Sequence, residues 1–291
     1  MKVAFLGLGV MGYPMAGHLA HSGIEMTVFN RTKERVLKWM EQYPGTLAPT
    51  PAAAVKEADV VVSCVGNDDH LREILLGENG AFDAMRKGTL FIDHTTASAD
   101  LARELDREAR ERGFNFMDAP VSGGQAGAES GELTIMVGGT PTDFVHGAVV
   151  LDVYGKTVKL MGPVGSGQLT KMVNQICVAG LIESLAEGLH FAEAAGLNGN
   201  AVMSVLCNGA ASSWQMENRH QSMLRGEYDF GFAVDWMRKD LGMALSEAKN
   251  NGIELPVTEL VDQFYGDVQS MGGGRWDTSS LLARLQAKDI G

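Results

Sequence analysis

The 291-residue chain is poor in cysteine, proline, aromatic residues and positive charge. Its three cysteines lie far apart with no C-x-x-C pair, so we expect free thiols in a reducing compartment. The 24 Lys and Arg are outnumbered by 36 Asp and Glu, and the net charge of −12 argues against nucleic-acid binding through a generally basic surface. No apolar run approaches the ~18 residues of a membrane helix. We therefore expect a cytoplasmic protein that binds neither membrane nor nucleic acid.

Glycine is the residue in excess. There are 36 glycines, about 12% of the chain against the ~7% of average usage. They follow no triplet period, which excludes a collagen-like chain, and the 45% of hydrophobic residues excludes intrinsic disorder. Seventeen of the 36 glycines fall within residues 1–23 and 113–167. Glycine is required where backbone approaches another group closely, so these two segments are candidate binding loops.

The first half of the chain alternates short apolar runs with helix-like segments, which predicts a Rossmann-type, doubly wound parallel sheet. The expected strands are Val3–Leu6, Met26–Phe29, Val60–Val65, Leu90–Asp93 and Phe114–Met117, with Leu133–Val137 and Thr157–Leu160 as edge strands. The expected helices between them include Gly12–Ser22, Thr32–Gln42 and Ala99–Arg112. The apolar N-terminus resembles a signal peptide, but cleavage near residue 20 would remove the glycine-rich segment that follows it. We therefore expect a buried first strand and no targeting segment.

The second half is helical. Residues 169–195 form one long helical pattern, and further helical segments follow at 201–207, 214–225, 234–250, 256–271 and 279–286. The predicted organisation is an α/β Rossmann domain over residues 1–163 and an all-α C-terminal domain over 164–291, joined by a long interdomain helix.

A G-x-G-x-x-G motif links the first predicted strand to the first predicted helix. It consists of Gly7, Leu8, Gly9, Val10, Met11 and Gly12. In this context the motif indicates dinucleotide binding, with the pyrophosphate at the helix N-terminus.

The residues after the second strand select the cofactor. An acidic residue there would bind the ribose 2′-OH of NAD. This chain has Asn30, Arg31 and Thr32 instead, and a guanidinium can pair with the 2′-phosphate of NADP. NADP is the predicted cofactor, with NAD as the alternative.

A second glycine-rich stretch, DAPVSGGQAGAESGELTIMVGG, covers residues 118–139. It offers the hydroxyl of Ser122 and the consecutive backbone amides of Gly123 and Gly124, which together can bind an anion such as a substrate carboxylate.

Four stretches in this order resemble the β-hydroxyacid dehydrogenase family: GLGVMGYPMAGHL at 7–19, residues 118–139, GPVGSGQLTKMVNQ at 162–175 and KDLGMAL at 239–245. The resemblance implies that Lys171 is catalytic, that Ser122, Gly123 and Gly124 hold the substrate carboxylate, and that Lys239 closes over the nicotinamide end of the site. It further implies cofactor contacts from the residues after two strands, which are Val65, Gly66, Asn67, Thr95 and Thr96.

Lys171 and the amides one turn later form the predicted catalytic group. Asn174 and Gln175 lie at i+3 and i+4 on the same helix face. Lys171 is predicted to give a proton to the substrate oxygen during reduction and to take it back during oxidation. Many family members have Asn at the place of Gln175, so which amide touches substrate stays open. Two further departures are His18 where Asn is common and Gly66 where Pro is common.

The predicted function is NADP(H)-dependent interconversion of a small hydroxy acid with its aldehyde or keto acid. Glyoxylate and succinic semialdehyde come first as substrates, then tartronate semialdehyde, with 3-hydroxyisobutyrate-type oxidation as the reverse. The alternatives are imine reduction on the same scaffold and a non-catalytic NADP-binding module. Lys171 and the Ser122 loop argue against imine reduction, and the retained Lys171 argues against a non-catalytic module. The resemblance implies a homodimer or homotetramer, and the scattered histidines indicate no metal site.

Overall fold

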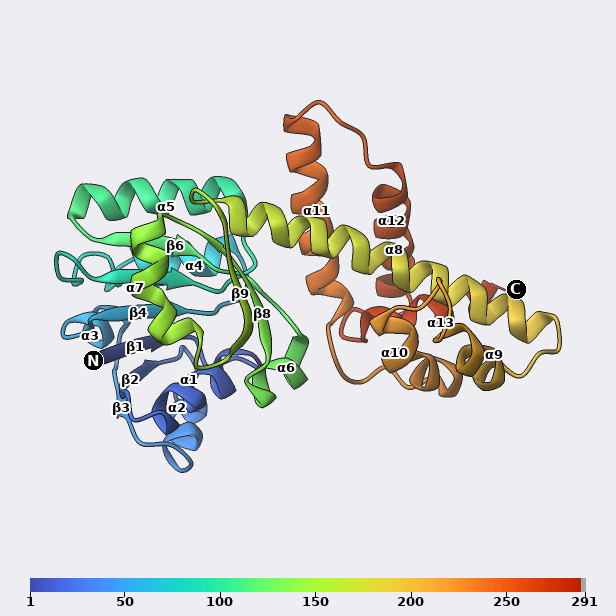
Figure 1. Cartoon of the computed structure of the whole chain (residues 1–291), viewed down its shortest axis with the longest axis horizontal. Helices are drawn as coiled ribbons and strands as arrows, with labels where there is room; N and C mark the ends of the chain where they lie inside the picture. The colour runs from blue at the N-terminus through green and yellow to red at the C-terminus, as the bar shows by residue number, and fades with distance from the viewer. Residues whose placement is uncertain (289–291) are drawn as a thin grey trace. The chain divides into compact units, whose positions relative to one another are not determined.

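The computed structural model describes residues 1–288 and divides into two compact units (Figure 1). The first unit runs from Met1 to Lys171 and the second begins at Met172. The division falls inside a long helix, α8 (Ser166–Ala194). The predicted domain boundary at 163/164 lies just ahead of that helix and stays a prediction.

The first unit is a nine-stranded sheet covered by helices on both faces. Its strands are β1 (Lys2–Leu6), β2 (Glu25–Phe29), β3 (Thr46–Leu47), β4 (Val60–Ser63), β5 (Leu90–Asp93), β6 (Asn115–Asp118), β7 (Val121–Ser122), β8 (Leu133–Gly138) and β9 (Gly155–Gly162). Its helices before α8 are α1 (Gly12–His21), α2 (Lys33–Met40), α3 (Pro51–Val55), α4 (Asp68–Leu76), α5 (Ala99–Arg112), α6 (Gly124–Ser130) and α7 (Pro141–Leu151).

The strand order β3-β2-β1-β4-β5-β6 is that of a dinucleotide-binding sheet, and all of these strands are parallel. Alternate residues of β1 face opposite sides: Val3 and Phe5 join one apolar cluster, while Ala4 and Leu6 join another. A sheet buried on both faces must have apolar residues at nearly every position, which is why these strands appear as continuous apolar runs. The predicted Rossmann-type fold is confirmed.

The expectation of two edge strands at 133–137 and 157–160 is wrong for the first of them. β8 is an inner strand: it pairs antiparallel with β6 and then β7 along one edge and in parallel with β9 along the other. The ladder between β6 and β8 consists of a single residue pair, Asp118 with Gly138. Such a junction depends on pairing between distant segments, and no local sequence pattern encodes it.

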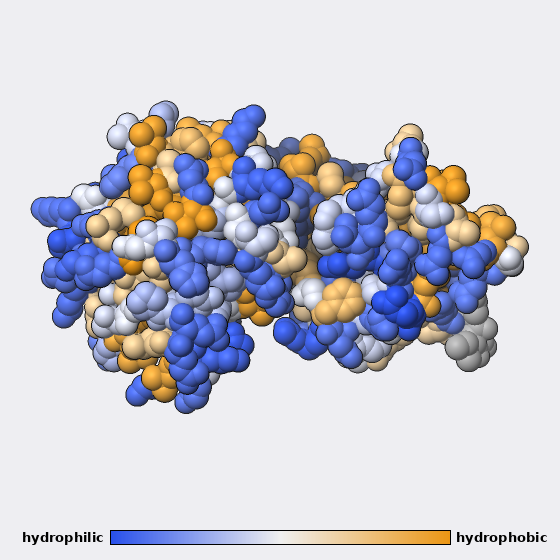
Figure 2. Space-filling view, turned by 60° about the horizontal axis from the view of Figure 1, so that its bottom comes forward, coloured by the Kyte–Doolittle hydropathy of each residue, from blue (hydrophilic) through white to orange (hydrophobic). Residues whose placement is uncertain are grey.

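The second unit, within the described residues, contains helices and no named strand. After α8 come α9 (Gly199–Leu206), α10 (Trp214–Arg225), α11 (Val234–Asn250), α12 (Pro256–Ser270), a 3₁₀ turn at Thr278–Ser280 and α13 (Leu281–Lys288). An apolar cluster that includes Ile182, Met237 and Tyr265 forms its core. The face shown in Figure 2 is largely hydrophilic, with hydrophobic patches on both units.

Candidate active site

The predicted dinucleotide loop has the geometry that its sequence requires. Gly7 has a φ of +104° and donates its N–H to the carbonyl of Phe29 at 2.8 Å. A Cβ at Gly7 would overlap the carbonyl oxygen of Cys64, so only glycine fits between β2 and β4. A Cβ at Gly9, in contrast, would meet no protein atom within 4 Å. The loop is therefore packed against the sheet at Gly7 and open at Gly9.

The N-terminus of α1 has no side-chain cap. Met11 occupies the N-cap position without a capping hydrogen bond, and the first turn contains no acidic residue. Four N–H groups at a helix start lack partners within the helix, and together with the helix dipole they favour an anion. The residues present thus fit the pyrophosphate of a dinucleotide.

Two side chains from the segment after β2 hold this loop. Asn30 accepts a hydrogen bond from the N–H of Leu8 at 2.9 Å, and Arg35 donates to the carbonyl of Leu8 at 3.3 Å. Arg35 was missed at the sequence level, because its contact lies 27 residues away along the chain. Arg31 and Thr32 are exposed, and Arg31 forms no hydrogen bond or ion pair within residues 1–288. Its guanidinium is available to a ligand.

The predicted contacts after β4 and β5 meet at one edge of the sheet. Val65 donates its N–H to the hydroxyl of Thr95 at 3.1 Å, which joins the two loops. Asn67 accepts from the N–H of His70 at 2.9 Å and caps α4. Gly66 and Thr96 lie in the same two loops. Asn67 therefore has a structural role that the sequence had not assigned to it.

The segment after β6 carries the predicted carboxylate loop. Ser122 ends β7, and Gly123 and Gly124 follow with φ values of +131° and +60°. Gly124 begins α6, a helix that the sequence analysis did not predict. His18 on α1 contacts the carbonyls of Ala128 and Glu129 at the far end of α6 through Nε2. A carbonyl oxygen can only accept a hydrogen bond, so this geometry requires a proton on Nε2 of His18.

Buried titratable groups line the same edge of the sheet. Burial raises the pKa of Asp93 to about 7, although Ser63 and the N–H of Thr95 donate hydrogen bonds to it. Burial lowers the pKa of His94 to about 4, so this imidazole is neutral at pH 7. It donates from Nδ1 to the carbonyl of Ala119 and accepts at Nε2 from the hydroxyl of Tyr154.

Lys171 lies at the start of α8, one turn after Gln168. The amides that follow it belong to the second unit. Asn174 donates to the side-chain oxygen of Gln175 at 2.7 Å, and Gln175 donates to Asp240 at 2.7 Å. Both ends of the Gln175 amide are therefore used within the protein.

Asp240 also pairs with Lys239, whose Nζ lies 3.1 Å from its Oδ1. Lys239 Nζ stands 5.6 Å from the ring centroid of Trp236, within the range of a cation–π contact. Asp240 was missed at the sequence level even though it belongs to the KDLGMAL stretch, because its role comes from partners on two different helices.

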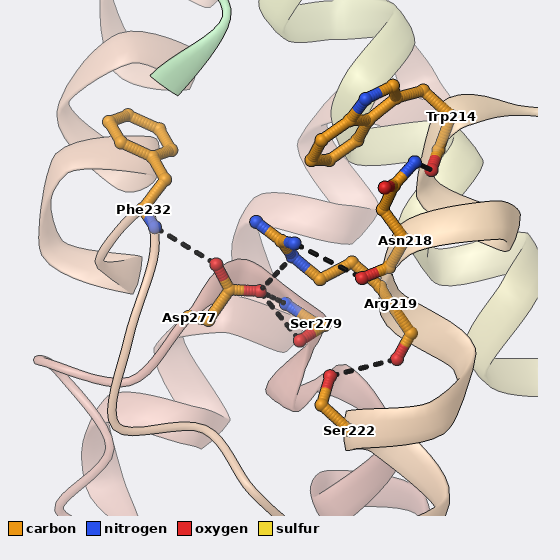
Figure 3. A network of polar contacts seen from close by, with 7 residues as sticks. All are labelled: Trp214, Asn218, Arg219, Ser222, Phe232, Asp277 and Ser279. Carbon is orange, nitrogen blue, oxygen red and sulfur yellow. Dashed lines mark hydrogen bonds and ion pairs between the residues drawn. The ribbon is translucent and has the colours of Figure 1, made fainter. Parts of the chain in front are cut away.

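The loop that leads into α11 is held by a polar network around Asp277 (Figure 3). This buried carboxylate accepts from the N–H of Phe232 at 2.9 Å, from the hydroxyl of Ser279 at 2.6 Å and from Arg219 Nε at 3.2 Å. The Arg219 guanidinium also lies 4.9 Å from the ring centroid of Trp214. The network positions the beginning of the helix that carries Lys239 and Asp240.

Within residues 1–288, no group of three or more His, Cys, Asp or Glu side chains is placed to hold a metal ion. Nor does any helix there have the length and apolar character needed to cross a membrane.

In the first unit, the cofactor and substrate residues predicted from sequence gather at the carboxyl ends of β1, β2, β4, β5 and β6. This is where open α/β sheets bind their ligands. A dinucleotide loop, an arginine beyond β2 and a lysine at the start of a long helix define the class: an oxidoreductase that uses a nicotinamide cofactor.

Comparison with known proteins names the family. Residues 2–162 match the NAD-binding domain of 6-phosphogluconate dehydrogenase, and residues 165–285 match the NAD-binding domain of NADP-dependent 3-hydroxyisobutyrate dehydrogenase. The chain belongs to the β-hydroxyacid dehydrogenase family, whose members are NAD(P)-dependent oxidoreductases acting on CH–OH groups. The resemblance seen in the sequence is confirmed.

Two relatives and one solved structure illustrate the similarity. An uncharacterized oxidoreductase of Shewanella frigidimarina is 59% identical over 285 residues, which is 98% of each chain. The 2-hydroxy-3-oxopropionate reductase of Escherichia coli is 35% identical and covers 98% of this chain and 97% of its own. The solved structure of Mycobacterium tuberculosis 3-hydroxyisobutyrate dehydrogenase with L-serine has a TM-score of 0.89, 28% identity and 98% coverage of both chains.

Proposed function

We propose that this enzyme reduces a small aldehyde or keto acid to the hydroxy acid with NADPH, using Lys171 as the general acid. The observation that carries the proposal is the position of Lys171, one turn into a helix that begins at the ligand-binding edge of the sheet. The substrates that we place first are glyoxylate and succinic semialdehyde, followed by tartronate semialdehyde. The last is the substrate in the name of the E. coli relative, 2-hydroxy-3-oxopropionate reductase.

The preference for NADP rests on the segment after β2. Arg31 is exposed there and has no carboxylate neighbour in its own segment, which reads Asn30-Arg31-Thr32. Arg35 adds a second positive charge one helical turn later, and its guanidinium already lies at the dinucleotide loop. Two guanidinium groups suit a 2′-phosphate, whereas a ribose 2′-OH would need an acceptor.

The substrate carboxylate is assigned to the Ser122 loop. Gly123 and Gly124 have positive φ and form the turn that leads into α6, and successive N–H groups in such a turn can form a concave site for an anion. The hydroxyl of Ser122 adds a donor. A carboxylate held there would leave the carbonyl end of a short substrate to Lys171.

Lys171 moves the proton. When bound, the nicotinamide supplies the hydride that the carbonyl carbon accepts. The Lys171 ammonium donates its proton to the carbonyl oxygen as that oxygen becomes the alcohol, and the neutral amine then recovers a proton from solvent. In the oxidation direction the neutral amine takes the hydroxyl proton, so charge and protons balance both ways.

Asn174 is the better candidate than Gln175 for contact with substrate. The side chain of Gln175 is buried and hydrogen-bonded at both ends, to Asn174 and Asp240. We assign Gln175 the role of orienting Asn174. Lys239, paired with Asp240, is assigned to the nicotinamide end of the site, as the family resemblance implies.

We also propose that the chain forms a homodimer or homotetramer. Val173, Leu181 and Phe191 on α8 are 60%, 43% and 71% exposed, which is unusual for large apolar side chains on one helix. Light scattering coupled to size-exclusion chromatography measures the assembly, and a monomer at micromolar concentration would contradict this part of the proposal.

The proposed function is tested by following NADPH oxidation with a panel of glyoxylate, succinic semialdehyde, tartronate semialdehyde and keto acids, each repeated with NADH. Cyclic imines and amine–ketone mixtures form a second panel. We expect turnover of at least one carboxylate-bearing aldehyde, with kcat/KM higher for NADPH than for NADH. Turnover of imines alone would assign the scaffold to imine reduction, and equal or better rates with NADH would overturn the role of Arg31.

A further inference from the structure

Two buried side chains connect the first turn of α8 to the ligand-binding edge of the sheet. Asp118, the last residue of β6, is fully buried and accepts hydrogen bonds from the N–H of Gly165 at 2.7 Å and of Gln168 at 2.8 Å. The carboxylate thus caps the start of α8 from a different segment of the chain, and its charge lies at the positive end of the helix dipole.

Gln168 makes the second connection. Its side chain is 1% exposed, accepts from the N–H of Ala97 at 3.1 Å and donates to the carbonyl of Thr95 at 2.7 Å. Thr95 in turn accepts from the N–H of Val65. The first turn of α8 is therefore joined to the loop that we assign to the nicotinamide ribose.

The backbone packs tightly around the Asp118 carboxylate. A Cβ at Gly167 would lie 2.7 Å from Asp118 Oδ2 and would overlap the carbonyl oxygen of Met136. A Cβ at Gly138 would overlap Asp118 Oδ1. The helix start is held at a fixed distance from β6 and β8, because backbone contacts the carboxylate on both sides.

We propose that Asp118 and Gln168 are positioning residues that set the place of Lys171 relative to the cofactor and carboxylate loops. Lys171 lies three residues after Gln168 on the same rigid helix, while Asp118 lies four residues before Ser122. One carboxylate thus connects the acid–base helix to the substrate loop, and one amide connects it to the cofactor loop. This inference rests on the proposed function, since it takes Lys171 to be the proton donor.

The test compares Gln168→Met and Asp118→Asn with a matched control, Asp143→Asn. Met fills the volume of Gln without its hydrogen bonds, and Asn replaces Asp without its charge. Asp143 is also a buried carboxylate at a helix start; it accepts from the Thr140 hydroxyl at 2.6 Å, on α7. It belongs to neither the cofactor nor the substrate loop.

The kinetic readout is kcat with NADPH and with NADPH deuterated at C4, together with the Kd of NADPH. We expect kcat to fall 10- to 100-fold in Gln168→Met and Asp118→Asn, the isotope effect on kcat to rise, and the Kd of NADPH to change less than threefold. Partial unfolding would lower both rates equally and leave their ratio unchanged. A kcat loss no larger than that of Asp143→Asn, or a loss with an unchanged isotope effect, would overturn the inference.

A second readout needs no substrate. Hydrogen–deuterium exchange of residues 165–171 is expected to accelerate at least tenfold in both variants and to stay unchanged in Asp143→Asn. Unaltered exchange in Gln168→Met and Asp118→Asn would contradict the positioning role directly. If wild type reduces nothing in the panel, or Lys171→Ala keeps full turnover, the proposed function fails while the exchange measurement still decides whether these residues hold the helix.

Discussion

The N-termini of α1 and α8 lie in the same unit, and the backbone N–H groups at each favour an anion. The two helices differ in where that anion comes from. Each helix begins without an acidic residue in its first turn. At α1 no side chain caps the helix, and Gly9 leaves open space beside it. At α8 the anion is built into the protein, because Asp118 accepts from Gly165 and Gln168. One helix start is left to a ligand, and the other is used to hold Lys171 in place.

The two helix starts also differ in their effect on the stability of the free protein. A ligand phosphate brings its own charge only when bound, whereas Asp118 keeps a buried charge in the free protein. Burial raises the pKa of Asp118 to about 6 even though backbone amides donate to it, so the ionised form is disfavoured relative to the unfolded chain. The protein retains the carboxylate at the expense of stability, as is common for residues that serve a site.

The largest effect is expected at the residue that the α8 cap would position. Lys171→Ala should lower kcat by about 10² to 10⁴ because it removes the proton donor. The Kd of NADPH should stay within threefold, since the cofactor loop is untouched. Stopped-flow and steady-state NADPH oxidation measure both quantities. Near-normal kcat at saturating substrate would show that Lys171 is not the acid.

The second effect concerns the charge at α8 and appears in the pH dependence of stability. The pKa of Asp118 is about 6 in the fold against 3.8 as its ordinary value, so the folded state binds more protons between these values. The contribution of this residue to stability is therefore highest below pH 4 and falls as pH rises through 6. The shift corresponds to about 3 kcal/mol at most.

Denaturant titrations of wild type and Asp118→Asn at intervals from pH 4 to pH 8 isolate this contribution. The free energy of unfolding of wild type, minus that of the variant, should decrease with rising pH. A difference that is constant, or that grows with pH, would contradict the direction given for the pKa of Asp118.

The third effect concerns cofactor binding at the segment after β2. Arg31→Ala should raise the Kd of NADPH about 10- to 100-fold, because a charge-assisted hydrogen bond contributes ~1.5–3 kcal/mol. The Kd of NADH should change little. Calorimetry with both cofactors gives the two constants, and Lys33→Ala, two residues further along at the start of α2, is the charge-matched control. If the Kd values of NADH and NADPH rise equally, Arg31 does not bind the 2′-phosphate.

The smallest effects come from one glycine at each helix start. Gly9→Ala places a methyl group where no protein atom lies within 4 Å, so stability should be unchanged or slightly higher while the Kd of NADPH rises about tenfold. Gly167→Ala places it against Asp118 and the Met136 carbonyl, so the free energy of unfolding should fall by about 1–3 kcal/mol. Thermal unfolding and cofactor titration of both variants distinguish a ligand-facing glycine from a packed one. A loss of stability in Gly9→Ala together with unchanged stability in Gly167→Ala would contradict the difference drawn between the two helix starts.

The sequence alone predicted the elements and loops whose signals are local. β1, the glycine loop and α1 follow one another within about twenty residues, and local apolar runs and glycine positions predict the conformation of each. The long helix and both α10 and α11 were predicted for the same reason. α6 was missed because a helix containing Gly124 and Gly127 has low intrinsic propensity; packing at Ala128 and the contact from His18 stabilise it instead.

The partners of the predicted residues could not be found in that way. Asp118 meets Gly165 across 47 residues, Gln168 meets Ala97 across 71, and Gln175 meets Asp240 across 65. No periodicity relates such positions, since their contact depends on how strands and helices pack. The roles of Arg35 and Asp240 could not be predicted for the same reason, although both residues lie beside motifs that were identified.

Local chemistry therefore decided which segments are strands, helices and glycine loops, and so which family and cofactor class this chain belongs to. It could do so because backbone conformation and short-range burial patterns are properties of neighbouring residues. Tertiary packing decided which of two equivalent helix starts is left open to a ligand anion and which receives a carboxylate from β6. That choice depends on which groups the fold brings within hydrogen-bonding distance, and only the folded chain contains that information.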